Sequence, residues 1–440
     1  MAFLPLTANW ATEVRETLEY QTTITVANDG SEQRRSLRQR PRRTLAFDVL
    51  LAGDARREAV PFISRYQRAE NRIPDPVAEA AFVLQTPATS SDTAVITHQP
   101  SWLVGGRYVA FIYKTQVSEY RVQTVNLSGD SATISFENAF GRTWPAGTKV
   151  LPSVTGYLRS SVDSTRRTAD VATASIEFAV LPDGTDSEVY DGLPAIAFGR
   201  EMLAHRPNWT GDATDTFVAE SVDLDYGRGR IRRFTPNVNP GRSFVMDFVC
   251  RDREAVLKLT SLFRHARGRR GEFVMPTWTN DLVMSQDVPA GSSSLRTTNR
   301  RFGQAYSGDP VFASLVIVGQ DGTLMPARIL SATADNTGTT VVLDRVFPTG
   351  LARAAVQQVC LAPVARFAAD SLQITWRSSE VAVIRITCQT LKFLAPEDAL
   401  LDDGAAYLIS AYGWNFVKGT LVDPLQVIVN VTYPLATEHV

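Results

Sequence analysis

The sequence predicts a mainly β protein built from two tandem copies of one module, with one helix in each copy. Three observations lead to this fold class. Short apolar runs, alternating or continuous, are separated by Gly, Asp and Asn turns along most of the chain. A weak internal repeat relates the first half to the second, and a helical segment follows the same strand in both halves. We therefore expect two β-barrel or sandwich modules, each carrying an excursion rich in β-hairpins.

The repeat keeps a nearly constant register. Asn9-Trp10 recurs as Asn208-Trp209, 199 residues later. At this shift six further identities align, namely Thr17, Gly30, Arg34, Pro41, Arg43 and Asp48 with Thr216, Gly229, Arg233, Pro240, Arg242 and Asp247. Near the end of each copy the shift is 210, and Leu151, Val154, Ser161, Thr165, Arg167, Val171, Ala172 and Ile176 align with Leu361, Val364, Ser371, Thr375, Arg377, Val381, Ala382 and Ile386. A net insertion of 11 residues in the second copy accounts for the difference, and loops absorb such insertions at low cost. We interpret the pattern as a duplication.

Each copy contains a buried strand followed by a helix. Residues 45–50 and 244–249 read as matching strands that carry one acid each. In the second copy Asp252 is a suitable helix N-cap and Gly268 a natural stop. In the first copy Pro61 interrupts the helical pattern, so this helix is expected to start late or to kink.

Hairpins and a closing strand complete each predicted module. Segments 121–127 and 132–137 flank a turn at Ser128-Gly129-Asp130, and similar turns occur at 320–322 and 336–338. Alternating strands at 171–180 and 381–391 end the copies. Because the last strand repeats as faithfully as the first, we expect the two to pair. The predicted boundaries are 1–196 for module 1 with an excursion at about 85–150, 197–396 for module 2 with an excursion at about 280–360, and 397–440 for a C-terminal extension with a strand.

The composition fits a globular protein with packed cores. Its 440 residues are too many for one typical domain, and 44% are hydrophobic. Lysine plus arginine number 45 against 46 acids, and this near-neutral balance argues against binding nucleic acid through bulk charge. The N-terminus lacks a basic and apolar leader, and no run is long enough for a membrane span. We expect a soluble protein that is made in a cytoplasm and has no membrane partner.

No motif for catalysis or for cofactor binding stands out. Cys250, Cys360 and Cys388 are widely spaced and read as buried small hydrophobes. The four histidines fall in no metal-binding frame, and no nucleophile elbow, phosphate loop or dinucleotide fingerprint occurs. We therefore predict no enzyme activity, no metal and no cofactor. A hydrolase built on paired carboxylates stays open, because sequence cannot show two acids facing across a cleft.

Two features rise above this background. The first is an arginine cluster in corresponding regions of both copies, from which we take Arg34, Arg35, Arg38, Arg40, Arg43, Arg228, Arg230, Arg232, Arg233 and Arg242 as candidates for a subunit interface. Solvated arginines on an exposed hairpin, or contacts to a phosphate polymer, are the other interpretations. The second is residues 268–281, which follow the second helix. As residues that anchor the modules we predict Trp10, Asp48, Trp209, Asp247, Phe273, Trp278 and Asp281.

These motifs resemble those of the distal tail and tail-hub-adaptor proteins of long-tailed, siphophage-like bacteriophages. The resemblance rests on a strand opening with Pro-x-Arg and ending in Asp, a helix with a late Phe, Gly-Arg-x-Gly-x-Phe and Pro-Thr-Trp-x-x-Asp. The matching residues are Pro240, Arg242, Asp247, Phe263, Gly268, Arg269, Phe273, Pro276, Trp278 and Asp281. The first copy keeps Pro41, Arg43 and Asp48 but has no clear counterpart of the last two motifs.

The resemblance implies a structural virion protein of the tail tip, assembled in the bacterial host cytoplasm. Such a protein forms a homo-oligomeric ring that joins the tail tube protein to the tail hub or baseplate. With two modules per chain, three subunits would make a pseudo-sixfold ring. The alternative is a carbohydrate- or receptor-binding tail protein, with Trp102, Tyr108 and Trp144 as exposed sugar platforms.

Overall fold

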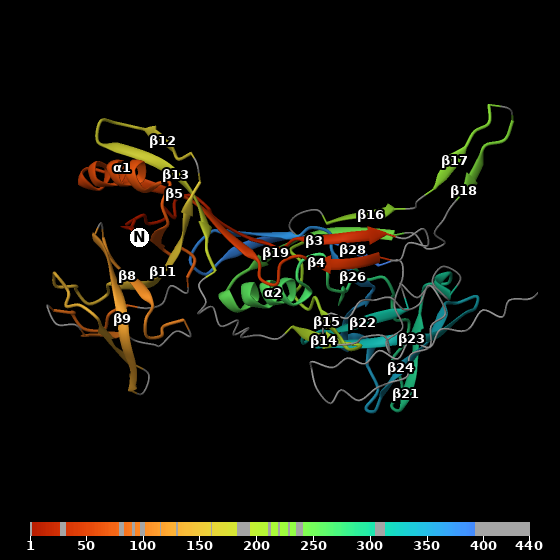
Figure 1. The fold of residues 1–440 in the computed structure, drawn as a ribbon. Helices are drawn as coiled ribbons and strands as arrows, with labels where there is room; N and C mark the ends of the chain where they lie inside the picture. Colours follow the sequence, from red (N-terminus) through yellow and green to blue (C-terminus); the bar gives the residue numbers. More distant parts are fainter. Residues whose placement is uncertain are drawn as a thin grey trace, which may run out of the picture. The chain divides into compact units, whose positions relative to one another are not determined.

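The computed structural model describes most of the chain up to residue 391 (Figure 1). The described residues are 2–26, 32–78, 83–89, 93–96, 102–114, 116–128, 131–159, 161–182, 194–209, 213–218, 221–227, 229–234, 241–303 and 313–391. They form a mainly β protein with one α-helix in each copy, as predicted. Residues 395–440 form a separate unit. The strand predicted there lies outside the described residues.

Eight antiparallel strands run through both copies in one continuous order. The order is β12 (Asp163–Arg166), β13 (Val171–Val180), β5 (Arg42–Ala52), β2 (Val14–Glu19), β27 (Ser371–Trp376), β28 (Ala382–Thr390), β19 (Gly241–Cys250) and β16 (Thr214–Val218). The first four strands come from copy one and the last four from copy two. The copies therefore share one sheet, and they meet where β2 pairs with β27.

The two copies have the same internal strand order and the same register. The closing strand pairs with the Pro-x-Arg strand in each copy, β13 with β5 and β28 with β19, which confirms the expected pairing. Arg15 lies opposite Ala46, and Thr214 lies opposite Val245, so both partners are displaced by 199 residues. The amide of Asn9 donates to the Asp48 carbonyl at 2.7 Å, and Asn208 repeats this bond to Asp247 at 2.7 Å. These equivalences support the duplication inferred from the sequence.

The helices differ in how they begin and in how much of them is buried. Helix α2 (Arg253–Ala266) is capped by the Asp252 carboxylate, which accepts from the Ala255 amide at 2.8 Å. It ends at Arg267 and Gly268, both with positive φ, which is the left-handed termination that glycine favours. Helix α1 (Asp54–Tyr66) contains Pro61 but starts at Asp54, so the expected late start is wrong. A proline removes one hydrogen bond, the one from its own position to the carbonyl four residues earlier, so the other bonds of the preceding turn can still form.

Three hydrophobic cores lie in the described residues. The largest contains side chains from both copies and both helices. The second is built only from residues between Leu84 and Val150, and the third only from residues between Leu282 and Leu361. Each of the smaller cores thus has its own strands.

The smaller cores are formed by hairpins. The predicted turns at 320–322 and 336–338 are confirmed, whereas Gly129 and Asp130 of the other predicted turn lie outside the described residues. In copy one the strands are β7 (Thr93–Ile96), β8 (Tyr108–Tyr113), β9 (Gln116–Ser128), β10 (Ser131–Phe136) and β11 (Lys149–Leu158). In copy two a curled, half-barrel sheet has the order β21 (Ser292–Thr297), β24 (Thr339–Phe347), β23 (Leu324–Ala334), β22 (Ser314–Gly319) and β25 (Val356–Leu361). A short 3-10 helix, η2 (Arg353–Ala355), precedes β25.

The remaining strands are short strands of the large sheet or form separate hairpins. Short strands at the sheet are β1 (Ala2–Phe3), β6 (Asn71–Pro74), β14 (Ala195–Ala197), β15 (Arg200–Met202), β20 (Phe273–Val274) and β26 (Val364–Phe367). Two equivalent hairpins stand apart from it, β3 (Thr22–Val26) with β4 (Glu32–Ser36), and β17 (Val222–Leu224) with β18 (Arg232–Phe234). No helix in the described ranges is long and apolar enough to cross a bilayer.

Candidate assembly interface

The junction between the copies is a six-residue pairing of β2 with β27. Leu18 of copy one lies opposite Leu372 of copy two, and each is only 2% exposed. The buried carboxylate of Glu16 accepts a hydrogen bond from Trp376 Nε1 at 3.1 Å. Backbone pairing therefore combines here with apolar burial and a buried polar contact. We call this β2·β27 contact the seam.

An ion cluster of Arg43, Glu16 and Asp75 links β2 to the neighbouring strand β5. The Arg43 guanidinium donates to Glu16 at 2.6 Å and to Asp75 at 2.7 Å. Burial by itself lowers the pKa of Arg43, but the charges of Asp75 and Glu16 outweigh it and raise the pKa above its usual range. The arginine therefore stays charged and holds both carboxylates. It fixes the strand that carries Glu16 into the seam.

Hairpin β3–β4 reaches across to copy two and binds it through charged groups. Arg34 donates to the Glu272 carboxylate, and its other nitrogen donates to the Arg270 carbonyl at 2.9 Å. Glu32 accepts two bonds from Arg366, at 2.8 and 2.9 Å. Burial alone raises the pKa of Glu32, but the hydrogen bond and charge of Arg366, followed by Arg34, lower it below its ordinary value. Both pairs are partly buried, and the Arg366–Glu32 pair is bidentate, the geometry in which arginine–carboxylate pairs are strongest.

The base of the same hairpin packs beside the end of α2. The Asp370 carboxylate accepts from the Thr22 amide at 2.7 Å and from its hydroxyl at 2.8 Å. The Tyr20 ring lies 5.6 Å from the Phe263 ring and its hydroxyl donates to the Arg264 carbonyl at 3.4 Å. A Cβ on Gly268 would come within 3.1 Å of Tyr20 Cβ and 2.7 Å of the Asp370 carboxylate. Copy one thus covers α2 at close range.

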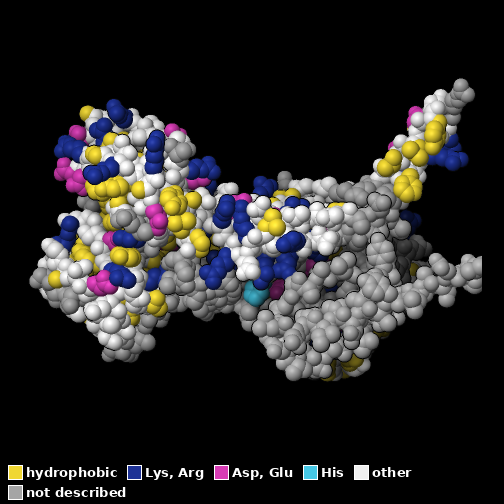
Figure 2. Space-filling model, viewed as in Figure 1, with side chains coloured by type: hydrophobic (Ala, Val, Ile, Leu, Met, Phe, Trp, Pro, Cys, Tyr) yellow, Lys and Arg dark blue, Asp and Glu magenta, His cyan; other side chains and the backbone are white. Residues whose placement is uncertain are grey.

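Copy two has equivalents of β2 and of hairpin β3–β4, namely β16 and hairpin β17–β18, and their strand residues are largely exposed. Arg242 binds Asp215 at 2.5 Å, which repeats the Arg43–Glu16 pair 199 residues later. Strand β16 and hairpin β17–β18 nevertheless carry exposed large apolar side chains, including Phe217 at 69%, Tyr226 at 73% and Phe234 at 61%. Figure 2 shows hydrophobic and basic side chains together on this hairpin. Its Arg233–Asp223 pair, at 2.7 Å, lies in solvent, and the hydrogen bond from Arg233 lowers the pKa of Asp223.

The ten predicted interface arginines divide into two groups. Half have carboxylate partners within the chain: Arg34, Arg38, Arg43, Arg233 and Arg242. Arg35, Arg40, Arg230 and Arg232 are exposed, and Arg228 lies outside the described residues. Arg34 bridges to copy two rather than to a second molecule. Contact of the exposed arginines with another subunit stays a prediction.

The predicted anchoring residues also divide. Phe273 and Trp278 are buried in the main core, and Asp281 accepts from the Leu361 amide at 2.8 Å and from Thr279 at 2.9 Å. Asp48 accepts from Ser175 at 2.6 Å, and Asp247 lies 3.4 Å from Arg385. Trp10 and Trp209 are instead 37% and 48% exposed. In both copies the neighbouring Asn makes the structural contact, through its backbone amide.

Sequence reasoning overlooked the acidic partners of these arginines. They include Glu16, Glu32, Asp75 and Glu272. One signal was available, because an acid recurs at the repeat shift, Glu16 in copy one and Asp215 in copy two. Conserved charge at equivalent positions of a duplication indicates a shared ion pair.

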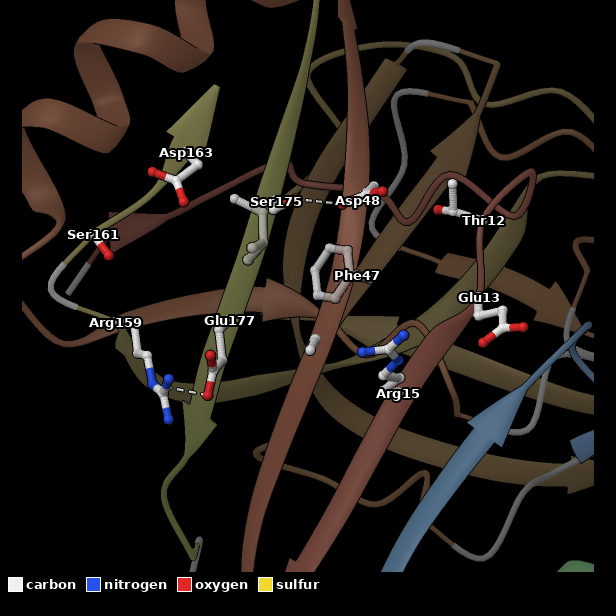
Figure 3. Close-up of a pocket in the computed structure, with 12 residues that line it drawn as sticks. Thr12, Glu13, Arg15, Phe47, Asp48, Arg159, Ser161, Asp163, Ser175 and Glu177 are labelled. Carbon is white, nitrogen blue, oxygen red and sulfur yellow. Dashed lines mark hydrogen bonds and ion pairs between the residues drawn. The ribbon is translucent and has the colours of Figure 1, made fainter. Parts of the chain in front are cut away.

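An open groove of about 660 Å³ lies on the outward face of β2, β5 and β13 (Figure 3). Figure 3 shows Asp48 bonded to Ser175 and Glu177 paired with Arg159, the latter at 2.8 Å. Glu13 pairs with Arg377 of copy two. Three of its carboxylates are thus engaged by neighbours, which gives no support to a pair of acids acting on a substrate. The groove extends to β12, the strand at the open end of the sheet.

The aromatic residues proposed as sugar platforms are packed in or against the second core. Trp144 is fully buried and its Nε1 donates to the Tyr120 hydroxyl at 2.9 Å. Trp102 packs against the same core, and Tyr108 is covered by the Arg72 guanidinium at 3.7 Å. These three residues do not form an exposed stacking surface. The receptor-binding alternative loses the residues on which it was based.

The three cysteines are buried and free. Burial raises the pKa of Cys250 and of Cys360 to about 12. Within the described residues no group of His, Cys, Asp and Glu is arranged to hold a metal ion. No protein-family model matches the chain, and a search of curated proteins finds no match.

Proposed function

We propose that this chain is a structural, non-enzymatic virion protein of a phage tail tip. It forms a ring that joins the tail tube to the tail hub or baseplate. One observation carries the proposal: the two copies of the module contact each other head to tail, through unlike edges, with β2 of one against β27 of the other. Such a heterologous contact, repeated, generates a ring when its rotation closes.

Support comes also from the nature of the seam. It combines main-chain pairing, apolar burial and a buried hydrogen bond, and the adjoining hairpin β3–β4 adds a bidentate ion pair, a mixture that suits a permanent subunit contact. A chain with two such modules supplies one finished contact and leaves one unfinished edge at each end. Three chains would then present six quasi-equivalent modules to a sixfold tube and three identical faces to a threefold hub. The resemblance of residues 240–281 to tail-adaptor proteins points to the same place in the virion.

The native mass of the full-length protein across a range of concentrations tests this proposal. We expect a trimer, either alone or after mixing with the tail tube protein. A chain that is monomeric at every concentration and binds no tail component would contradict the ring.

A further inference from the structure

Both ends of the eight-strand run are open edges. Among the described residues β16 pairs only with β19, and β12 pairs only with β13. All four residues of β12 are exposed, and so are Thr214 to Phe217 in β16. Exposed edge strands offer unpaired amides and carbonyls to any strand that fits them. The two edges are therefore candidates for pairing.

The two edges are the equivalents of the strands already joined in the seam. Strand β16 corresponds to β2 at the shift of 199, and β12 corresponds to β27 at the shift of 210. Within the chain, copy one offers its β2 to the β27 of copy two. Copy two has no third copy in the same chain to which it can offer β16. A second molecule can supply the missing partner, because the outer edge of its β12 is unpaired among the described residues.

Transferring the register of the seam to these edges gives compatible cross-strand pairs. The pair Leu18–Leu372 becomes Phe217 opposite Val162, which is apolar on both sides. The pair Arg15–Thr375 becomes Thr214 opposite Thr165, and Glu16–Ile374 becomes Asp215 opposite Ser164. Apolar pairs and hydroxyl pairs of this kind stabilise antiparallel strands. Next to Asp215, Arg166 takes the position that Trp376 has beside Glu16, so an ion pair replaces the hydrogen bond from an uncharged indole to a carboxylate.

The two hairpins differ in the same way as the two edge strands: one has a partner in the chain, and its equivalent is exposed. Both hairpins are two-stranded sheets of their own, but β3–β4 binds the region just after α2, whereas every strand residue of its equivalent β17–β18 is exposed. In Figure 1 no other labelled strand lies beside β17 and β18. Its side chains Val222, Leu224 and Phe234 are exposed. Such a cluster of exposed apolar residues marks an interaction surface.

Copy one shows the matching uncovered face. Val60 in α1 is 51% exposed, whereas its equivalent Val256 in α2 is 4% exposed. Tyr157 is 42% exposed, whereas Phe367 at the same place in copy two is 2% exposed. The side chains missing a cover in copy one are thus those whose equivalents are buried in copy two. Burial of the exposed apolar hairpin of one molecule against the exposed apolar surface of another would favour their association.

We propose that β16 of one molecule pairs antiparallel with β12 of a second copy of this chain, in the register of β2 with β27. Hairpin β17–β18 then lies against the α1 side of that second copy. This inference rests on the proposed ring and specifies its subunit contact. The sheet becomes continuous from molecule to molecule, with an identical strand order at the seam within each chain and at the contact between chains.

A disulfide placed across the two edges tests the register. Thr216 and Asp163 become opposite partners on the outward face, as Thr17 and Gln373 are within the chain. The full-length double variant Thr216→Cys with Asp163→Cys is oxidised and analysed on a non-reducing gel. We expect covalent oligomers, because opposite residues in antiparallel strands approach closely enough for a disulfide. The native cysteines are buried, so they contribute little.

Two matched variants control this experiment. Thr17→Cys with Gln373→Cys should close the equivalent disulfide inside one chain, without a change in mass. Thr216→Cys with Thr165→Cys displaces one thiol by two residues, and we expect loss of most of the cross-linked product. Equal cross-linking by the displaced pair would overturn the register.

A photo-cross-linking amino acid at position 217 identifies the occupant of the β16 edge. Isotope-labelled and unlabelled chains are mixed, so that cross-links between chains are recognised by mass. We expect peptides containing residues 161–166 of the other chain. Cross-links to residues 397–440 would show that the C-terminal extension occupies the edge and would overturn the inference. Native mass of the same samples separates the proposals: a trimer cross-linked elsewhere leaves the ring intact, whereas a monomer at all concentrations contradicts both.

Discussion

The two copies of the module have the same strand order, yet their surroundings differ. In copy two, helix α2 buries eight of its residues, whereas the described side chains of α1 include one buried residue, Ala59. Strand β2 has a neighbour on each side, whereas its equivalent β16 has one neighbour among the described residues. The hairpin of copy one contacts copy two, whereas the equivalent surface of copy one, with Val60 and Tyr157, is exposed. The difference shows that equivalent elements of the two copies are buried to different extents, and that a contact with the other copy accompanies the greater burial.

The largest effect should follow from removing the arginine of the buried ion cluster. Arg43→Ala leaves Glu16 and Asp75 without their cation, and both carboxylates are about one-tenth exposed or less. Breaking a buried pair typically costs about 3–5 kcal/mol. Denaturant unfolding should show this loss. The matched variant Arg242→Ala removes the equivalent pair, whose Asp215 is 33% exposed, and should cost less. Equal losses would mean that the two environments do not differ.

The next effect compares the apolar residues of the seam and of the open edge. Leu18→Ala empties a fully buried site and should cost about 2–5 kcal/mol of unfolding free energy. Phe217→Ala, at the equivalent exposed position, should change the stability of the isolated chain by about 0.5 kcal/mol or less. The same variant should weaken self-association, as measured by native mass against concentration. A large loss of monomer stability in Phe217→Ala would mean that this side chain is already covered.

A smaller effect concerns the acid dependence of the hairpin contact. The pKa of Glu32 is lowered in the folded chain, so its contribution to stability is present above about pH 4.5 and is lost as the pH falls through the folded pKa. Glu32→Gln should cost about 1 kcal/mol at pH 7. Its unfolding midpoint should also depend less on pH between 3 and 5 than that of the parent chain. Parallel pH profiles of the two proteins would show that Glu32 is not coupled to Arg366.

The smallest effect is expected at the equivalent free hairpin. Asp223→Asn removes the partner of Arg233, but this pair lies in solvent, where ion pairs contribute little. Thermal unfolding of the isolated chain should therefore be unchanged. Comparison of this variant with Glu32→Gln distinguishes the hairpin that contacts copy two from the equivalent hairpin, whose ion pair is exposed to solvent. A clear drop in the midpoint would place the β17–β18 hairpin against another part of the molecule.

Much of the local structure was predictable from particular residues. Asp252 and Gly268 bound α2 as expected, because capping and left-handed termination depend on neighbours within a few positions. The turns at 320–322 and 336–338 joined the predicted strands for the same reason. In α1, the late start expected from Pro61 is wrong, since the helix begins at Asp54 and extends through the proline. The candidate site was predictable only in part, because Arg34 and Arg43 were selected without their acidic partners.

The sequence by itself determined the mainly β class, the helix in each copy and the repeat register, since periodicity and turn chemistry are local. It also placed equivalent residues, such as Arg43 and Arg242, without any knowledge of contacts. Only the tertiary structure decided that β2, the last strand of copy one in the sheet, pairs on its other side with β27 of copy two. An alternating strand presents the same pattern to any partner, so pairing between distant strands depends on long-range packing and charge that periodicity does not encode. For that reason the open edges at β12 and β16 became visible only once the chain was folded.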